Sequence, residues 1–145
     1  MAKGLEDILG DAKKKGSELW SSLKNTSKDK LKEGIEKLNK ALPDIEEAGF
    51  ELTRLDVDIA LLPRLFTRFH QVRVISPEER EAILAKTKDD KFLNFMLIGL
   101  FKAIDIRNEV EIDNLGLKEI ELEIGLTPSV KLIFRRDKQI NLIGE

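Results

Sequence analysis

The feature that most constrains this chain is an almost entirely apolar segment near its middle, Phe92 to Ile104. Its length favours a helix over a strand, and on a helical wheel it is apolar over roughly 240°, with Asn94, Lys102 and the following Asp105 as the polar exception. It is too short to cross a bilayer, which needs about 20 residues. We therefore expect a central helix that is shielded on most sides by folded neighbours, by a subunit or by a bound molecule.

Three kinds of cover remain open for this segment, because periodicity does not distinguish between them. It can be a plain core helix, the wall of a cavity for a hydrophobic ligand such as a fatty acid, or a dimer interface. Methionine is adaptable and phenylalanine is bulky, which suits a cavity wall as well as a core. The candidate ligand or interface residues are Phe95, Met96, Leu100, Phe101 and, on a helix near the N-terminus, Trp20.

Two amphipathic helices are predicted ahead of this segment. Apolar residues recur at helical spacing from Leu5 to Leu23, within an arc of roughly 120°, and a second, narrower stripe runs from Leu31 to Leu42. We expect residues 1–49 to form a helical hairpin that docks on the rest of the chain. Gly16 and Gly34 lie on the apolar sides of the two helices, so we expect them to mark a close crossing.

The end of the second helix carries two punctuation signals. Pro43 either stops this helix or starts a short further turn, and Gly49 closes it in the position after the helix C-terminus.

The N-terminal helix is also a candidate for binding a membrane surface, because Trp20 lies at the edge of its apolar stripe. From Lys3 to Lys24 there are five lysines and four acids, a net charge of +1. Each basic residue contributes only about 1 kcal/mol of attraction to anionic lipid. Docking on the protein's own second helix or on a partner is therefore the favoured prediction, and membrane binding is the weaker alternative.

After residue 49 the hydrophobic period changes from 3.6 to 2. Apolar and polar residues alternate from Phe50 to Leu61, with a bulge predicted at Arg54–Leu55, and Pro63 interrupts the run. The segment from Arg64 to Ile75 is predicted to return as a second strand. The two strands would form a β-hairpin.

A short helix and three strands are predicted around the apolar segment. Ser76-Pro77-Glu78-Glu79 is a strong helix start with a capping box, and that helix should run to about Thr87. Alternating strands are then expected at Val110–Asp113, Ile120–Ile124 and Val130–Phe134, joined by turns. Acids on the middle strand can face bases on the last one, which favours an antiparallel meander.

These elements predict an α+β fold: an N-terminal amphipathic helical hairpin packed on an antiparallel sheet with a buried central helix. We expect residues 1–145 to form one domain, with 1–49 as the hairpin subregion. Residues 50–145 would hold the β-hairpin, two helices and the three-stranded meander.

Composition excludes several chemistries. The chain has no cysteine, which excludes disulfides, iron–sulfur clusters and thiol nucleophiles. The net charge of −2 opposes general nucleic-acid binding. The carboxylate pair Asp56 and Asp58 lacks the further ligands of a calcium loop, and no glycine-rich phosphate loop is present, so we expect no metal and no cofactor. The start of the sequence meets acids at once, so we expect no secretory signal and a cytoplasmic location.

One basic segment is the candidate polar site. Between residues 64 and 75 lie three arginines and the single histidine, and the candidate anion-binding residues are Arg64, Arg68, His70 and Arg73. A histidine beside arginines can serve a small enzyme or bind an anion. The structural alternative, which we favour, is that these bases pair with the acids between Asp105 and Glu123, a segment with seven acids and two bases.

The sequence as a whole predicts a non-enzymatic binding or interaction module that uses apolar surface to hold a protein partner, a second subunit or a hydrophobic ligand. Two alternatives stay open. One is a small enzyme or anion-binding protein with its site around His70 and the arginines, and the other is a membrane-surface protein that binds through its N-terminal helix.

Overall fold

The structure is a computed structural model, and it describes residues 10, 13–14, 16–17 and 27–136. Within these residues the α+β class is confirmed, because helices occur together with one sheet whose neighbouring strands are all antiparallel. The elements are α2 (Ser27–Glu47), β1 (Phe50–Asp58), β2 (Arg64–Gln71), α3 (Pro77–Lys86), α4 (Lys91–Glu109), β3 (Leu115–Ile124) and β4 (Ser129–Arg136).

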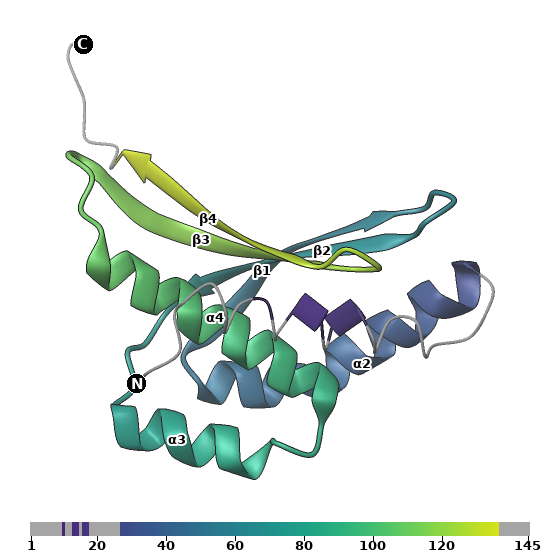
Figure 1. The fold of residues 1–145 in the computed structure, drawn as a ribbon, viewed down its shortest axis with the longest axis horizontal. Coiled ribbons are helices and arrows are strands. Elements are labelled where there is room, and N and C mark those ends of the chain that lie inside the picture. The colour runs from purple at the N-terminus through teal and green to yellow at the C-terminus, as the bar shows by residue number, and fades with distance from the viewer. Residues whose placement is uncertain (1–9, 11–12, 15, 18–26, 137–145) are drawn as a thin grey trace.

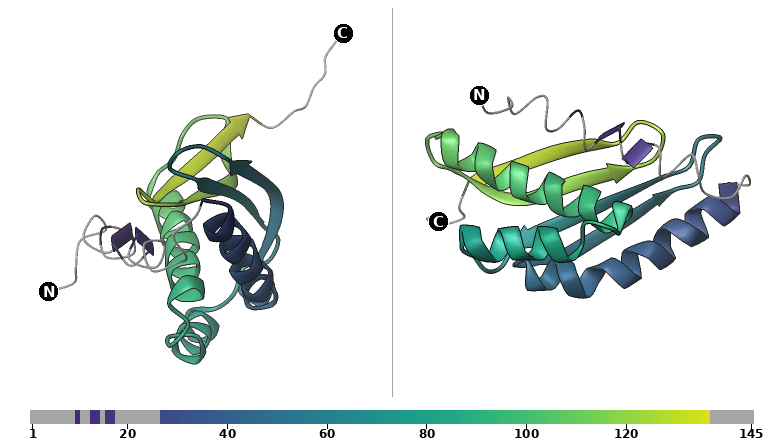
Figure 2. Two further views of the ribbon diagram at one scale, coloured as in Figure 1. Left: turned by 90° about the vertical axis from the view of Figure 1, so that its right-hand side faces the viewer. Right: turned by 60° about the horizontal axis from the view of Figure 1, so that its bottom comes forward.

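The four strands form one sheet with the order β1-β2-β3-β4, and every neighbouring pair is antiparallel. The sheet is strongly twisted, and the described helices all lie on one of its faces (Figure 1). α2 and α4 lie side by side against that face, while α3 lies beyond α4, farther from the strands (Figure 2). The other face of the sheet is covered by no described element.

α4 is the buried central helix that the apolar segment predicts. It is longer than expected, because Asp90 caps its start by accepting a hydrogen bond from the Leu93 amide at 3.1 Å, and the helix continues to Glu109. Ten of its residues are buried, from Phe92 to Ile104. Buried side chains of α2, α3, β1, β2 and β3 complete the same core.

The short helix α3 begins as predicted. Ser76 is its N-cap and Pro77 its first residue, and Glu79 closes a capping box with Ser76. Thr87 is the C-cap, which confirms the predicted end.

The second predicted helix runs through its proline. α2 continues past Pro43 to Glu47, so this proline neither stops the helix nor starts a separate turn. Gly49 follows with φ of 101°, the left-handed conformation predicted for a closing glycine. The first predicted helix lies mostly outside the described residues; residues 10, 13–14 and 16–17 are helical.

The hairpin of β1 and β2 is confirmed, with three differences in detail. β1 ends at Asp58 instead of Leu61, so the end of the predicted first strand belongs to the loop before Pro63. The register shift falls between Leu52 and Arg54, slightly before the predicted position. β2 ends at Gln71 instead of Ile75, because the amides of Val72 and Arg73 both turn to the Gly49 carbonyl oxygen, at 2.8 and 3.2 Å.

The prediction of a strand at Val110–Asp113 is wrong. Val110 caps the C-terminus of α4, and the Leu115 amide donates to the Ile112 carbonyl at 3.1 Å, which closes a tight turn through Asn114 at φ 63°. Only an isolated bridge links Ile112 to Leu115. Residues 110–113 therefore form the end of α4 and a turn instead of a strand. In the sheet, β3 lies between β2 and β4.

The antiparallel pairing of the last two strands is confirmed. Glu121 lies opposite Lys131, as the acid-facing-base pattern predicts.

Candidate functional site

The apolar candidates of α4 lie inside the chain's own core. The side chains of Phe95, Met96 and Leu100 are fully buried, and Phe101 is 3% exposed. Phe101 packs against Phe50 with ring centroids 5.9 Å apart. These residues are covered by the protomer itself, so any interface or ligand contact reaches them only through a neighbouring hollow. Trp20 lies outside the described residues.

The N-terminal segment contributes to that cover at its described positions. A Cβ on Gly16 would lie 3.0 Å from Cε1 of Phe95. The hydroxyl of Ser17 donates to the carbonyl of Leu126 at 2.9 Å, in the turn between β3 and β4. Gly16 therefore makes its close approach to α4. Gly34 is buried in α2, and its meeting with the first helix stays a prediction.

Arg64 is engaged by acids on both neighbouring strands. Its Nη2 lies 2.6 Å from Oδ2 of Asp58 and its Nη1 lies 3.4 Å from Oε2 of Glu123. The hydrogen bond with Asp58 is the main cause that raises the pKa of Arg64. The guanidinium also stacks over the Phe66 ring at 5.1 Å, so its charge and its flat face are both occupied.

Arg68 is held in the same way on the open face of the sheet. Its Nη2 lies 3.0 Å from Oε1 of Glu121, and its Nη1 lies 3.7 Å from Oε1 of Glu119. Burial raises the pKa of Glu119, but hydrogen bonds from Thr53 and Arg135 and the charges of Arg135 and Arg68 hold it below its ordinary value. The arginines of β2 thus pair with acids of the neighbouring strands within one sheet, as the structural alternative predicts.

His70 and Arg73 do not join these arginines in one site. His70 is exposed, and its Nδ1 donates to the carbonyl oxygen of Lys118 at 2.9 Å. Arg73 lies after the end of β2, where it donates to the carbonyl oxygen of Glu47 and approaches Glu79 at 3.9 Å. Among the described residues, no serine or carboxylate lies within hydrogen-bond reach of the histidine, so the contacts that a general base requires are not assembled there.

An exposed apolar tip lies on the loop between β1 and β2. Ile59 is 79% exposed, Leu61 is 92% exposed and Leu62 is 58% exposed. We call these three residues the hairpin tip. It forms the right-hand end of the sheet in Figure 1, the same end at which α2 begins. Sequence reasoning missed it as a site, although an apolar run just before Pro63, where a turn is expected to be polar, was the available signal.

The residues next to the hairpin tip are packed, whereas the tip itself projects from the fold. Pro63 is buried, and a Cβ on Gly125 would lie 3.1 Å from Cγ of Arg64 and 3.4 Å from the carbonyl oxygen of Pro63. The ion pair Arg64–Asp58, at 2.6 Å, lies where the two strands enter the loop, and the ion pair Arg54–Asp56, at 2.9 Å, lies further along β1. The result is an apolar end with a rim of paired charges.

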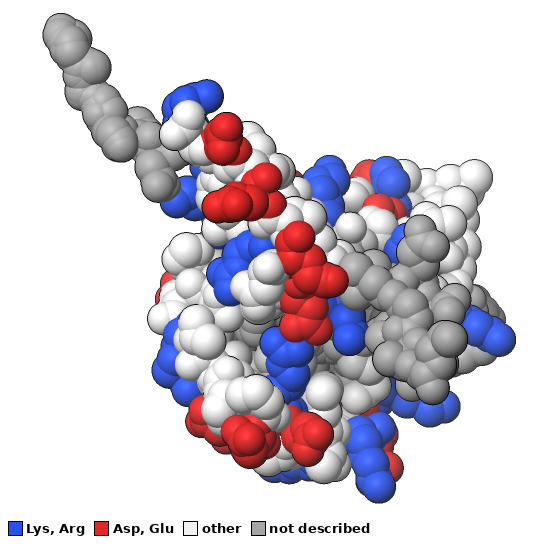
Figure 3. Space-filling view, turned by 60° about the vertical axis from the view of Figure 1, so that its left-hand side comes forward, with Lys and Arg blue, Asp and Glu red and all other residues white. Residues whose placement is uncertain are grey.

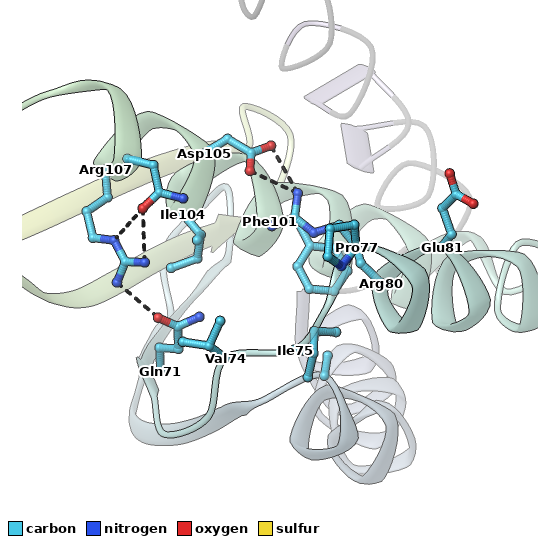
Figure 4. A pocket seen from close by; sticks show the side chains of 12 residues that line it. Gln71, Val74, Ile75, Pro77, Arg80, Glu81, Phe101, Ile104, Asp105 and Arg107 are labelled. Atoms are coloured by element: carbon cyan, nitrogen blue, oxygen red, sulfur yellow. Dashed lines mark hydrogen bonds and ion pairs between the residues drawn. The ribbon is translucent and has the colours of Figure 1, made fainter.

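A groove of about 410 Å³ lies at the other end of the molecule, between α3, the second half of α4 and the segment after β2 (Figure 4). We call it the α3–α4 groove. Its apolar lining is Ala48, Val74, Ile75, Pro77, Phe101 and Ile104, and its polar lining is Gln71, Arg80, Glu81, Asp105, Arg107 and Asn108. Phe101 is the one α4 candidate that reaches it.

The two arginines of the groove have different partners. Nη1 of Arg80 donates to both carboxylate oxygens of Asp105, at 2.9 and 3.1 Å, and its guanidinium lies 4.6 Å from the centre of the Phe101 ring. Arg107 instead donates to two neutral amide oxygens, of Gln71 at 3.0 Å and of Asn108 at 3.2 Å.

Charges of both signs are interspersed on the face at this end of the molecule (Figure 3). Within the described residues, no group of three histidines or acids is placed to hold a metal ion. In the same part of the chain, no helix is long and apolar enough to span a bilayer.

Comparison of the chain with protein-family models, with curated proteins and with solved structures found no match.

Proposed function

We propose that this protein is a non-enzymatic interaction module that holds a different protein through the hairpin tip. The exposure of Ile59, Leu61 and Leu62 carries the proposal. Apolar surface removed from water contributes about 25 cal/mol per Å², and a contiguous apolar patch is typical of an interaction site. The core does not need these side chains, since it is completed without them.

The surroundings of the tip favour a protein surface over a membrane. Its flanking charges are two ion pairs, which leave no net positive charge beside it. The nearby start of α2 has lysines at 28, 30 and 32 against Asp29 and Glu33, a net of one positive charge. At about 1 kcal/mol per basic residue, that excess attracts anionic lipid only weakly. A small apolar centre within a polar rim is instead the usual anatomy of a protein interface.

The shape of the tip favours a concave partner over a second copy meeting tip to tip. A stable interface buries about 800 Å² on each partner, more than three side chains supply. Two convex tips bury little against each other, whereas a pocket surrounds the tip and also contacts its charged rim. We expect a modest affinity in which Leu61 is the central anchor.

Site-directed crosslinking tests the proposal. A photoreactive benzoylphenylalanine replaces Leu61 in the full chain inside its native cells, and a matched variant has the same residue at exposed Lys88, in the loop between α3 and α4. We expect position 61 to crosslink to one defined protein and position 88 not to do so. The purified partner should then bind the natural chain at least tenfold more tightly than Leu61→Asp, a typical loss for a central anchor.

Three results would overturn it. One is binding of the partner that Leu61→Asp leaves unchanged. The second is self-association of the purified chain that this variant abolishes, and the third is Leu61-dependent sedimentation with phosphatidylglycerol vesicles. The melting temperature of Leu61→Asp should match that of the natural chain, because the side chain lies outside the core. His70→Ala should leave partner binding unchanged.

A further inference from the structure

We propose that the α3–α4 groove is a second, independent binding site, and that it takes a free amphipathic anion: a carboxylic acid with a single short apolar body. The groove and the hairpin tip lie at opposite ends of the fold, since α3 begins and α4 ends on the left of Figure 1 and the tip lies on its right. The proposal for the groove therefore does not depend on the proposal that the hairpin tip binds a partner.

The apolar half of the site is a floor with an exposed wall. Phe101 and Ile104 come from the buried face of α4 and form the floor, and they are 3% and 4% exposed. Val74 lies beside them and is 74% exposed, and it does not belong to the hydrophobic core. An apolar ligand body on this floor would cover Val74, which the protein's own chain leaves in water.

The polar half of the site is the guanidinium of Arg107. Its described partners are the amide oxygens of Gln71 and Asn108, which orient the side chain and leave its charge without a carboxylate. A guanidinium offers a flat fork that matches a carboxylate with two charge-assisted hydrogen bonds, and these are roughly twice as strong as neutral ones. A ligand carboxylate at Arg107 would therefore gain more than the amides it displaces.

The other charges of the groove fix which end of the ligand lies where. Arg80 is neutralised by Asp105, which also lies 3.5 Å from Lys102, and Arg80 is stacked on Phe101. Glu81 points away from Arg107 on the far side of the groove (Figure 4). The anionic end of a ligand thus belongs at Arg107, with its apolar body over Ile104 and Val74.

The size of the groove limits the ligand class. About 410 Å³ lies in the lower part of the range of small-molecule sites, roughly 300–1,000 Å³. That volume suits one short chain or one aromatic ring with an acid group. It is too small to enclose a two-chain lipid.

Amide NMR titration of the full chain tests the site, with octanoate as the probe and octanol as the uncharged match. We expect octanoate to shift the amides of Val74, Ile75 and Arg107, and we expect octanol to bind more weakly. Arg107→Gln should weaken octanoate binding about tenfold or more, the usual loss for a charge-assisted contact. Arg54→Gln, a matched change on the open face of the sheet, should leave it unchanged.

A second groove variant keeps the test independent of Arg107. Val74→Asp changes an exposed side chain, so it should fold normally, and it should repel the probe from the groove.

The proposal is overturned by saturating octanoate that leaves these amides unshifted, by equal binding of octanol, or by binding that survives both groove variants. It is also overturned if phosphatidylglycerol vesicles shift the same amides and free octanoate does not, because the anion would then be a lipid headgroup. Shifts confined to the hairpin tip would overturn the groove site and leave partner binding at the tip untouched.

Discussion

Gly49 is the residue on which the junction between α2, β1 and the end of β2 depends. Its carbonyl oxygen accepts from the amides of Val72 and Arg73, and its φ of 101° lies in the region that L side chains rarely adopt. A Cβ at this position would lie 2.1 Å from the carbonyl oxygen of Arg73, which is backbone and cannot rotate away.

We expect Gly49→Ala to destabilise the fold by about 1–3 kcal/mol or more, because strain at φ and a backbone clash add together. Gly116→Ala is the matched control, since the nearest atom to its Cβ is Nζ of Lys118 at 3.8 Å, an ordinary van der Waals distance. Chemical denaturation of the two variants measures the difference. Equal unfolding midpoints would contradict the junction described above.

The capping box of α3 makes the stability depend on pH at one residue. The Ser76 amide donates to Oε1 of Glu79 at 3.0 Å, and this bond is the main cause that lowers the pKa of Glu79 from its ordinary value of 4.5. A lowered pKa in the folded state means that the carboxylate stabilises the fold above pH 4.5, and this contribution is lost as the pH falls through the folded pKa.

We therefore expect the difference in unfolding free energy between the natural chain and Glu79→Gln to be greatest near neutral pH and to vanish in acid. Ser76→Ala removes the hydroxyl cap at a cost of about 1 kcal/mol and retains the backbone donor, so Glu79 should keep most of its lowered pKa. Denaturation across pH and NMR titration of the Glu79 carboxyl carbon check both statements. A midpoint for Glu79 at or above its ordinary value would refute them.

At the scale of elements, the sequence predicted what depends on local pattern. A few neighbouring residues are enough to recognise the cap at Ser76, the apolar run of α4 and the alternation of β1. The strand at Val110–Asp113 failed because four alternating residues between a helix end and an Asn114 turn leave no length for a ladder.

The two proposed binding surfaces depend on tertiary structure, and only the hairpin tip had a local signal, the apolar run before Pro63. The α3–α4 groove joins Gln71, Arg80 and Arg107, which are far apart in the sequence and on different elements. Whether an apolar residue is core or surface depends on where the helical layer ends, and this left Leu61 exposed and Leu65 buried within one hairpin. The paired charges of Arg64 and Arg68, by contrast, followed from acid and base counts.

The docking of the N-terminal segment is an element-scale contact that a single substitution tests. We expect Gly16→Leu to lower the melting temperature, because its Cβ meets three ring carbons of Phe95 at 3.0–3.1 Å and overpacking costs typically 1–3 kcal/mol. Gly10→Leu is the matched control, since nothing lies within 4 Å of its Cβ. Thermal unfolding of both variants measures the contrast, and an unchanged melt for Gly16→Leu would exclude the contact.

At the scale of the whole molecule, the core lies between the two surfaces that we propose as binding sites. One end presents the projecting hairpin tip, and the other presents the hollow of the α3–α4 groove. The face of the sheet away from the helices holds a network of ion pairs, such as Arg68 with Glu121. We expect binding at one end to leave the other end unchanged, because the two surfaces lie at opposite ends of the fold.

This division predicts opposite responses from two leucines. Leu100 is fully buried in α4, so Leu100→Ala should cost about 2–5 kcal/mol, the transfer term plus a cavity in a packed core. Leu61 is 92% exposed, so Leu61→Ala should change stability by no more than about 0.5 kcal/mol. Phe95→Asp should prevent folding altogether, since it places an unpaired charge beside Gly16 in that core. Urea denaturation of the two alanine variants measures the contrast, with circular dichroism of Phe95→Asp as the folding check. If Leu61→Ala proved as costly as Leu100→Ala, the tip would belong to the core and would not be free to bind a partner.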